Sequence, residues 1–196
     1  MKVPFSVYTV SVLVIGFIIG YLGLEVPASI MEISLYILVL AAGYLIGGEL
    51  ARLGKSVGKA FIAGGLLAFS TILSSIIGGL IVARLFGIDP RLGAVIGGAS
   101  GWYSLVGPMV SQVDPLMGLI GFLANLLREI IHILIYPVLA RCCWFPAVAV
   151  GGATTMDTGL PVVVIYGGRR ASIIAMIHGG LITLTVPIIL SLLLGY

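Results

Sequence analysis

GFLANLLREIIHILIYP, residues 121–137, is the stretch of this sequence that decides the fold. It lies inside an apolar run from Leu116 to about Ala140, which at 1.5 Å per residue is long enough to cross the hydrocarbon core as one helix. The run nevertheless carries polar side chains at i, i+3, i+4 and i+7, a spacing that places them on one stripe of the helix. The members of this polar stripe are Asn125, Arg128, Glu129 and His132.

Glu129 falls near the middle of the run, where a carboxylate is costly. Placing one isolated charge at the bilayer centre costs at least roughly 2.5 to 3.5 kcal/mol, so a membrane helix keeps it where it faces a partner, a ligand or a watery cavity. A purely structural alternative is that Arg128 and Glu129 neutralise each other or pair with neighbouring helices. Such a structural role needs one or two polar groups, whereas the stripe has four. The stripe is therefore the first candidate site.

The composition indicates a polytopic membrane protein. Of the 196 residues, 60% are hydrophobic and 9% are charged, against about 25% charged in soluble domains. The ten basic residues give a net charge of +3 and are scattered at segment ends, which excludes a nucleic-acid-binding surface. Cys142 and Cys143 are adjacent, so they predict neither a disulfide framework nor a metal site. No cofactor is expected.

Four ordinary membrane spans are expected from the apolar runs, over about residues 3–23, 30–50, 60–86 and 171–194. Two further segments, about 91–112 and 146–167, are rich in glycine and hydroxyl side chains, and each cluster is closed by a proline. A continuous helix through either is unfavourable, because each Gly costs about 1 kcal/mol and Pro about 3 kcal/mol relative to Ala. The sequence thus predicts an all-α integral membrane protein of about seven segments, two of them discontinuous or re-entrant, in a single transport domain over residues 1–196.

The two glycine clusters share the pattern Gly-Gly-Ala-Ser/Thr, which begins at Gly97 and again at Gly151. Unwound backbone at membrane depth survives only where protein or a water-filled cavity satisfies its N–H and C=O groups, and paired interruptions point to a transporter's binding site. We expect functional backbone groups at these breaks, at Gly97, Gly98, Gly101, Gly151 and Gly152. The distribution of basic residues mildly favours crossing by both segments, and it places the N-terminus inside and the C-terminus outside.

A second acid accompanies Glu129 if residues 146–167 cross the membrane, because Asp157 then lies near the same depth. A desolvated carboxylate can hold a proton at neutral pH until a cation displaces it, which suits exchange of protons for a cationic or amine-bearing solute. His178, in the last span, either relays a proton or bonds a backbone carbonyl.

Several ordered motifs carry a family resemblance. They are Gly-Trp102-Tyr103-Ser104-Leu, Asn125-Leu-Leu-Arg128-Glu129, Gly-Ala-Thr-Thr-Met156-Asp157, Leu160-Pro161 and Ile-His178-Gly. Together they resemble the bacterial and archaeal lysine exporter family, LysO, over most of the chain. The resemblance implies efflux of L-lysine across the cell membrane with inward proton movement, and essential roles for the two intramembrane acids. Longer members begin with an extra hydrophobic block that is missing here, so a homodimer or a small hydrophobic partner subunit is expected.

The expected mechanism divides the two acids between substrate and proton. Either Asp157 or Glu129 accepts an ammonium group of lysine while the other handles the proton. Neutral hydrogen bonds are expected from Ser100, Thr154 and Thr155 and from the freed backbone at the breaks.

Other residues of the motifs have two possible roles each. Arg128 either binds the substrate carboxylate in a bidentate manner or is tied to Glu129. Trp102 and Tyr103 either cover the aliphatic stem or an ammonium group of the substrate by cation–π contact, or serve as packing aromatics. Asn125, on the same stripe, is included among the binding residues.

Two alternatives belong to other classes of protein. Gly98-Ala-Ser100-Gly101 with His178 downstream resembles the serine and histidine of rhomboid intramembrane proteases. That interpretation leaves Glu129 and Asp157 without a role, so we expect no enzymatic activity. A structural subunit that does not itself transport is the third possibility.

Overall fold

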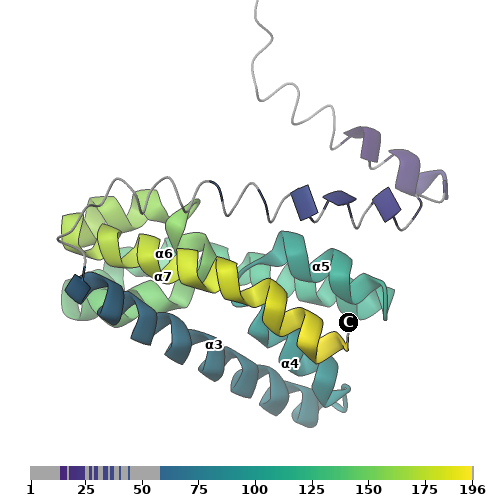
Figure 1. Cartoon of the computed structure of the whole chain (residues 1–196), viewed down its shortest axis with the longest axis horizontal. Helices are drawn as coiled ribbons and strands as arrows, with labels where there is room; N and C mark the ends of the chain where they lie inside the picture. Colours follow the sequence, from purple (N-terminus) through teal and green to yellow (C-terminus); the bar gives the residue numbers. More distant parts are fainter. Residues whose placement is uncertain are drawn as a thin grey trace, which may run out of the picture. The chain divides into compact units, whose positions relative to one another are not determined.

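A computed structural model describes residues 58–195 continuously, together with short stretches and single residues between 14 and 44. The chain divides into two compact units, Met1–Leu38 and Val39–Tyr196, and the continuous part lies in the second. Its elements are α3 (Gly58–Phe86), α4 (Pro90–Gly98), α5 (Tyr103–Ser111), α6 (Pro115–Gly151), the 3-10 helix η2 (Gly152–Met156) and α7 (Leu160–Leu194) (Figure 1). The expected spans over 3–23 and 30–50, with Lys2, Arg52 and Lys55, lie largely or wholly outside the described residues.

Three helical stretches of the described part are long and apolar enough to cross a membrane: Gly58–Phe86, Pro115–Met156 and Leu160–Leu194. Many large apolar side chains on them are exposed, such as Phe69, Leu127 and Ile188, as expected for helices surrounded by lipid. Two of the three contain a kink. Cys143 interrupts α6 with φ −149° and ψ 57°, and Gly168 interrupts α7 with φ 70° and ψ −174°.

The first glycine cluster forms a hairpin of two short helices. α4 begins with Pro90 after the cap Asp89, and the chain leaves the helical path at Ser100 and Gly101, whose φ angles are 48° and 98°. The two helical limbs of this hairpin, α4 and α5, then lie beside the same turn of α6. A Cβ atom on Gly121 would lie 3.3 Å from Ile96 in α4 and 3.6 Å from Val106 in α5.

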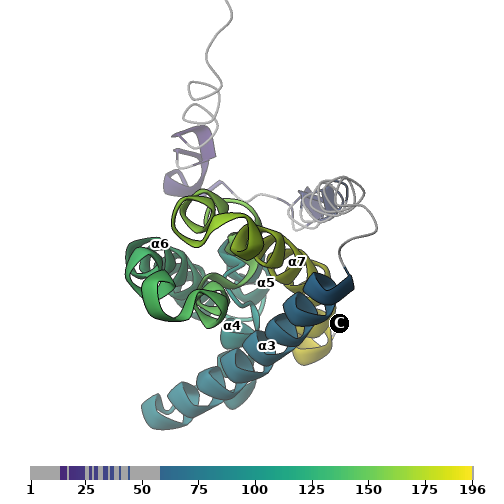
Figure 2. The ribbon, with the colours of Figure 1, turned by 90° about the vertical axis from the view of Figure 1, so that its left-hand side faces the viewer.

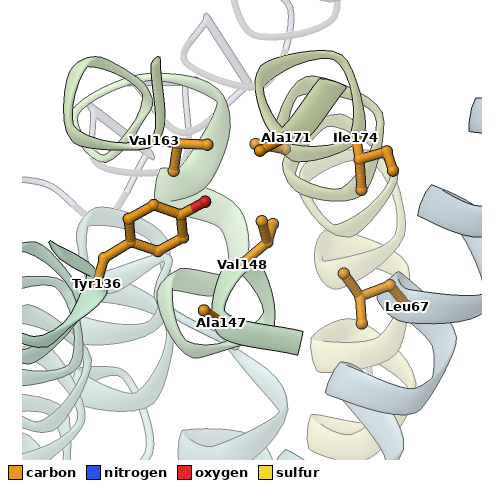
Figure 3. Packing of buried hydrophobic residues seen from close by; sticks show 8 residues of the cluster. Leu67, Tyr136, Ala147, Val148, Val163, Ala171 and Ile174 are labelled. Carbon is orange, nitrogen blue, oxygen red and sulfur yellow. The ribbon is translucent and has the colours of Figure 1, made fainter. Parts of the chain in front are cut away.

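The second glycine cluster folds back in the same way. Tyr136 of α6 packs in one cluster with Ala147, which precedes the break, and with Val163, which follows it (Figure 3). His132, one helical turn before Tyr136, lies against Gly151 and Gly159. Cβ atoms built on these two glycines would be 2.8 Å and 2.9 Å from the Cδ2 atom of His132. Residues 144–167 therefore form a second hairpin, with η2 at its tip.

The tips of the two hairpins touch each other beside the middle of α6. The N–H of Ala153 donates a hydrogen bond to the carbonyl oxygen of Ser100 at 2.8 Å. Glycine is required on both sides, because a Cβ atom on Gly101 would lie 2.7 Å from the Gly151 oxygen, and one on Gly152 would collide with the Ser100 oxygen. The repeated Gly-Gly-Ala-Ser/Thr pattern thus marks two unwound turns that pair with each other.

Both ends of each hairpin lie at the same end of the helical body. The distribution of basic residues had instead mildly favoured a crossing of the membrane by both segments. The second hairpin opens at the end where α3 begins, which faces the viewer in Figure 2. The first opens at the opposite end, near the C-terminus. Each helical limb of eight or nine residues is about 13 Å long, so a segment of 22 residues fits either one crossing or two limbs of half depth. Sequence length alone could not separate the two arrangements.

Candidate functional site

Glu129 lies beside the paired tips and is 8% exposed, and its Oε2 atom has no protein partner within hydrogen-bonding distance. The hydroxyl of Tyr103, at the start of α5, interacts with this carboxylate and is close enough to Asp157 for an electrostatic interaction. Asp157 and Glu129 also interact with each other. The structure therefore brings both acids together with Tyr103, from three different elements.

Asp157 differs from Glu129 in its surroundings. It lies in the turn between η2 and α7 and is exposed. Its Oδ1 atom accepts hydrogen bonds from the N–H of Thr158 at 2.6 Å and from the Thr158 hydroxyl at 3.3 Å. One acid of the pair is thus buried with one carboxylate oxygen unpartnered, while the other lies in an exposed turn.

Arg128 is tied to backbone rather than to Glu129. Its Nε and Nη2 atoms donate to the carbonyl oxygens of Val150 at 2.7 Å and Ala149 at 3.0 Å, and Nη1 donates to the Ser75 hydroxyl at 2.8 Å. These carbonyls belong to the last turn of α6, where the helix carries partial negative charge. Arg128 therefore anchors the second hairpin tip to α3, and its binding of a substrate carboxylate stays a prediction.

Asn125 holds the first hairpin tip. Its Oδ1 atom accepts from the N–H of Gly101 at 2.7 Å, and its Nδ2 donates to the oxygens of Ile96 and Gly121, both at 3.0 Å. Two of these partners, the Gly101 N–H and the Ile96 oxygen, belong to the first hairpin, so the side chain replaces helical partners that the break removes. Gly97 and Gly98 lie in the last turn of α4 and pack against α3 instead of forming the unwound tip.

At the first break, the two aromatic side chains have partners within the protein, whereas the buried serine hydroxyl has none. Trp102 is buried and donates from Nε1 to the Ser104 hydroxyl at 3.1 Å. Tyr103 contacts Phe122 edge to face, with 5.4 Å between ring centroids. Ser100 is fully buried and its hydroxyl has no protein partner.

His178 connects three elements through two threonines. Its Nδ1 atom lies 3.1 Å from the Thr155 hydroxyl and its Nε2 atom lies 3.0 Å from the Thr71 hydroxyl of α3. Thr155 also donates toward Gly152, and Thr154 donates to Gly151 at 2.9 Å, so both hydroxyls stabilise the tip. Since both ring nitrogens face threonines, the protease-like pairing of His178 with Ser100 is not formed.

Two further buried polar residues of α6 are the stripe member His132 and Tyr136, which the sequence pattern did not single out. Both ring nitrogens of His132 and the hydroxyl of Tyr136 lack a protein partner, although both side chains are 0% exposed. Their rings are 5.2 Å apart and tilted by 59°. The available signal was the spacing, because Tyr136 follows Asn125, Glu129 and His132 at i+11, i+7 and i+4 on the same stripe.

A separate open cavity of about 280 Å³ lies between α3, α4 and α6. Its walls are mostly apolar, with polar groups from Ser75, Asn125 and Arg128. Neither Glu129 nor Asp157 lines it, so it is distinct from the acid pair.

The comparisons with known proteins agree with one another. The family model described as "Lysine exporter LysO" matches residues 10–194. Lysine exporter LysO of Escherichia coli strain K12 is 34% identical over 183 residues, which cover 92% of this chain and 61% of the relative. A Haemophilus influenzae protein named "Putative lysine exporter" is 28% identical over 183 residues, covering 92% of this chain and 93% of its own length. No solved structure matches the chain. The match over residues 10–194 shows that the chain belongs to the lysine exporter LysO family.

Proposed function

We propose that this chain is the transport unit of a lysine/proton antiporter, and that Glu129 and Asp157 bind the exchanged cations. The observation that carries the proposal is that Glu129, which interacts with the Tyr103 hydroxyl, and Asp157 lie within electrostatic range of each other where two broken hairpins meet. Membership in the exporter family supplies the substrate class. The chain spans 61% of the E. coli relative, so the activity of the whole transporter is inferred here for this shorter chain.

The exchange follows from the electrostatics of two neighbouring carboxylates. Two neighbouring negative charges repel each other, and the burial of Glu129 removes water that would stabilise its charge, so the pair is most stable when it holds a proton or another cation. An ammonium group of lysine and a proton then compete for the same oxygens. Release of lysine to the outside leaves the pair ready to take up an external proton, and release of that proton inside leaves it ready for the next lysine.

The two hairpins give the proposed site access from both sides. We infer five crossing helices, namely α3, α6, α7 and the two expected N-terminal spans, with the hairpins entering from opposite faces. Lys59, Arg141, Arg169 and Arg170 lie at one end of the helical body, because their neighbours Ala60, Ala140 and Ala171 pack in one apolar cluster. Arg84 and Arg91 lie at the other end, in the last turn of α3 and the first turn of α4. The positive-inside rule makes the first end cytoplasmic, which places the N-terminus inside and the C-terminus outside.

A second copy of the chain or a small hydrophobic subunit completes the transporter in this proposal. α3 exposes Phe61, Leu66 and Phe69, and the cavity between α3, α4 and α6 is open. An apolar helix of a partner would cover one of these two surfaces. Cross-linking of the purified transporter in lipid would show which partner is present.

The test uses vesicles that contain the purified chain and an outward gradient of labelled lysine. We expect lysine efflux to be accelerated by an inward proton gradient, and Glu129→Gln and Asp157→Asn to reduce efflux to the level of empty vesicles. Asp114→Asn is the matched control, because Asn caps a helix as well as Asp and Asp114 only caps α6. Efflux like that of the wild type in both acid variants would remove the pair from the mechanism.

A further inference from the structure

We propose that Glu129, His132 and Tyr136 form a proton route along the buried face of α6, bridged by water, from the acid pair to the end of the molecule that carries Arg169. We call these three residues the polar track. The inference rests on the proposed function, because it names the path by which the exchanged proton travels. It adds two residues, His132 and Tyr136, to which the family resemblance gives no role.

The first support is the distribution of unpaired polar atoms. Five buried side-chain atoms of the described residues lack a protein partner, and four of them belong to the polar track: Glu129 Oε2, both ring nitrogens of His132 and the Tyr136 hydroxyl. The residues follow at i, i+3 and i+7, so they span about 10 Å along the helix axis. Buried polar atoms are normally bonded to protein or to ordered water. Four such atoms in one row therefore indicate a hydrated line rather than scattered packing faults.

The second support is the place where the track ends. The Tyr136 hydroxyl points away from α6 toward α7, between Val163, which precedes the kink at Gly168, and Ala171, which follows it (Figure 3). A Cβ atom on Gly167 would collide with this hydroxyl, so the backbone approaches it closely. The next residue, Gly168, is exposed and non-helical, and it is followed by the exposed Arg169. The kink thus brings the end of the track to the surface.

The chemistry of the three side chains suits proton transfer. A phenol hydroxyl both donates and accepts, and a neutral imidazole accepts on one nitrogen while it donates from the other. A proton that leaves Glu129 binds one nitrogen of His132 through a water molecule, and the opposite nitrogen releases its own proton toward Tyr136. No bond other than those to hydrogen changes, and a ring flip or the reverse transfer restores the starting tautomer.

The charged and titratable neighbours of His132 favour a short-lived imidazolium. Burial of the ring disfavours a charged imidazole, and the positive charge of Arg128 on the same helix adds to this effect. His178 on α7 is engaged with Thr71 and Thr155. Glu129, with Tyr103 and Asp157 around it, is the proton donor and acceptor at the inner end. The proton therefore passes His132 instead of resting there.

The test separates proton movement from lysine binding. Vesicles with a pH-sensitive dye inside and an outward lysine gradient report the coupled proton influx, and exchange of labelled for unlabelled lysine at equal pH reports lysine movement without net proton flow. We expect His132→Gln and Tyr136→Phe to slow proton influx by about 10²-fold and to keep lysine exchange. Tyr166→Phe, which removes an exposed phenol hydroxyl from the same limb, should behave like the wild type.

The outcomes distinguish the inference from the proposed function. If both track variants show proton influx like that of the wild type while Glu129→Gln abolishes it, the polar track is refuted. The proposal of an antiporter would still hold. Loss of lysine exchange in folded track variants would also refute the polar track, since the residues would then belong to the lysine site. Lysine efflux without proton influx in the wild type would instead refute the antiporter itself. Tyr136→Phe keeps the shape of the side chain, so its elution as a single species in detergent serves as the folding check.

Discussion

Asn125 shows that part of the polar stripe is structural. The stripe was predicted from helical spacing, and Glu129 on it is buried and lies within electrostatic range of Asp157. The functional roles of the two acids stay a prediction. The partners of Asn125 and Arg128 could not be predicted, because they are backbone groups of hairpin tips whose position depends on the tertiary fold. A sequence shows that a polar side chain is buried, but it does not show which distant carbonyl it will meet.

The role of Asn125 predicts a loss of stability. In Asn125→Ala the N–H of Gly101 and the oxygen of Ile96 lose their partner inside the protein. Leaving two such groups unsatisfied should lower the free energy of unfolding by about 2–4 kcal/mol, measured by denaturation in detergent micelles. Ser111→Ala is the control, because it removes a hydroxyl bonded only to Gly107 one turn earlier on the same helix. Equal stability of the two variants would show that Asn125 does not hold the tip.

At the level of elements, the breaks were predictable and their direction was not. Glycine and proline clusters indicated that residues 91–112 and 146–167 could not be continuous helices, and the chain does leave the helical path at 99–102 and 152–159. The fold-back depends on contacts such as Tyr136 with both limbs of the second hairpin. Local propensity contains no information about such contacts, because each limb alone is an ordinary short helix.

Because the hairpin tips contact each other, we predict that some glycines tolerate substitution by alanine and others do not. Gly152 has φ 62°, and a Cβ atom there would collide with the Ser100 oxygen, so Gly152→Ala should prevent the tips from meeting. We expect little folded protein and no lysine transport. Gly65→Ala is the matched control, because its nearest neighbour would be Leu181 Cδ1 at an ordinary 3.7 Å and Ala is a better helix former by about 1 kcal/mol. Yield and thermal unfolding in detergent measure both, and a Gly152→Ala protein as stable as the wild type would contradict the tip contact.

At the level of the whole molecule, the hairpins change how the basic residues are distributed. With both segments folded back, Arg141 and Arg169 lie at the same end as Lys59, while Arg84 and Arg91 lie where α3 ends and α4 begins. Arg91 is fixed at that second end because its guanidinium donates to the Leu193 and Leu194 oxygens of the C-terminal turn. The orientation proposed from the positive-inside rule rests on this asymmetry between the two ends.

Labelling of single cysteines tests this arrangement directly. In a background with Cys142→Ser and Cys143→Ser, cysteines placed at Arg141 and Arg169 should both react with a membrane-impermeant maleimide from the cytoplasmic side only. A cysteine at Gly87, in the exposed turn between α3 and α4, should react only from outside. If residues 146–167 crossed the membrane, positions 141 and 169 would instead be labelled from opposite sides. Labelling depends only on which side of the membrane a cysteine faces and not on transport. That result would therefore refute the second hairpin even if the protein did not transport lysine.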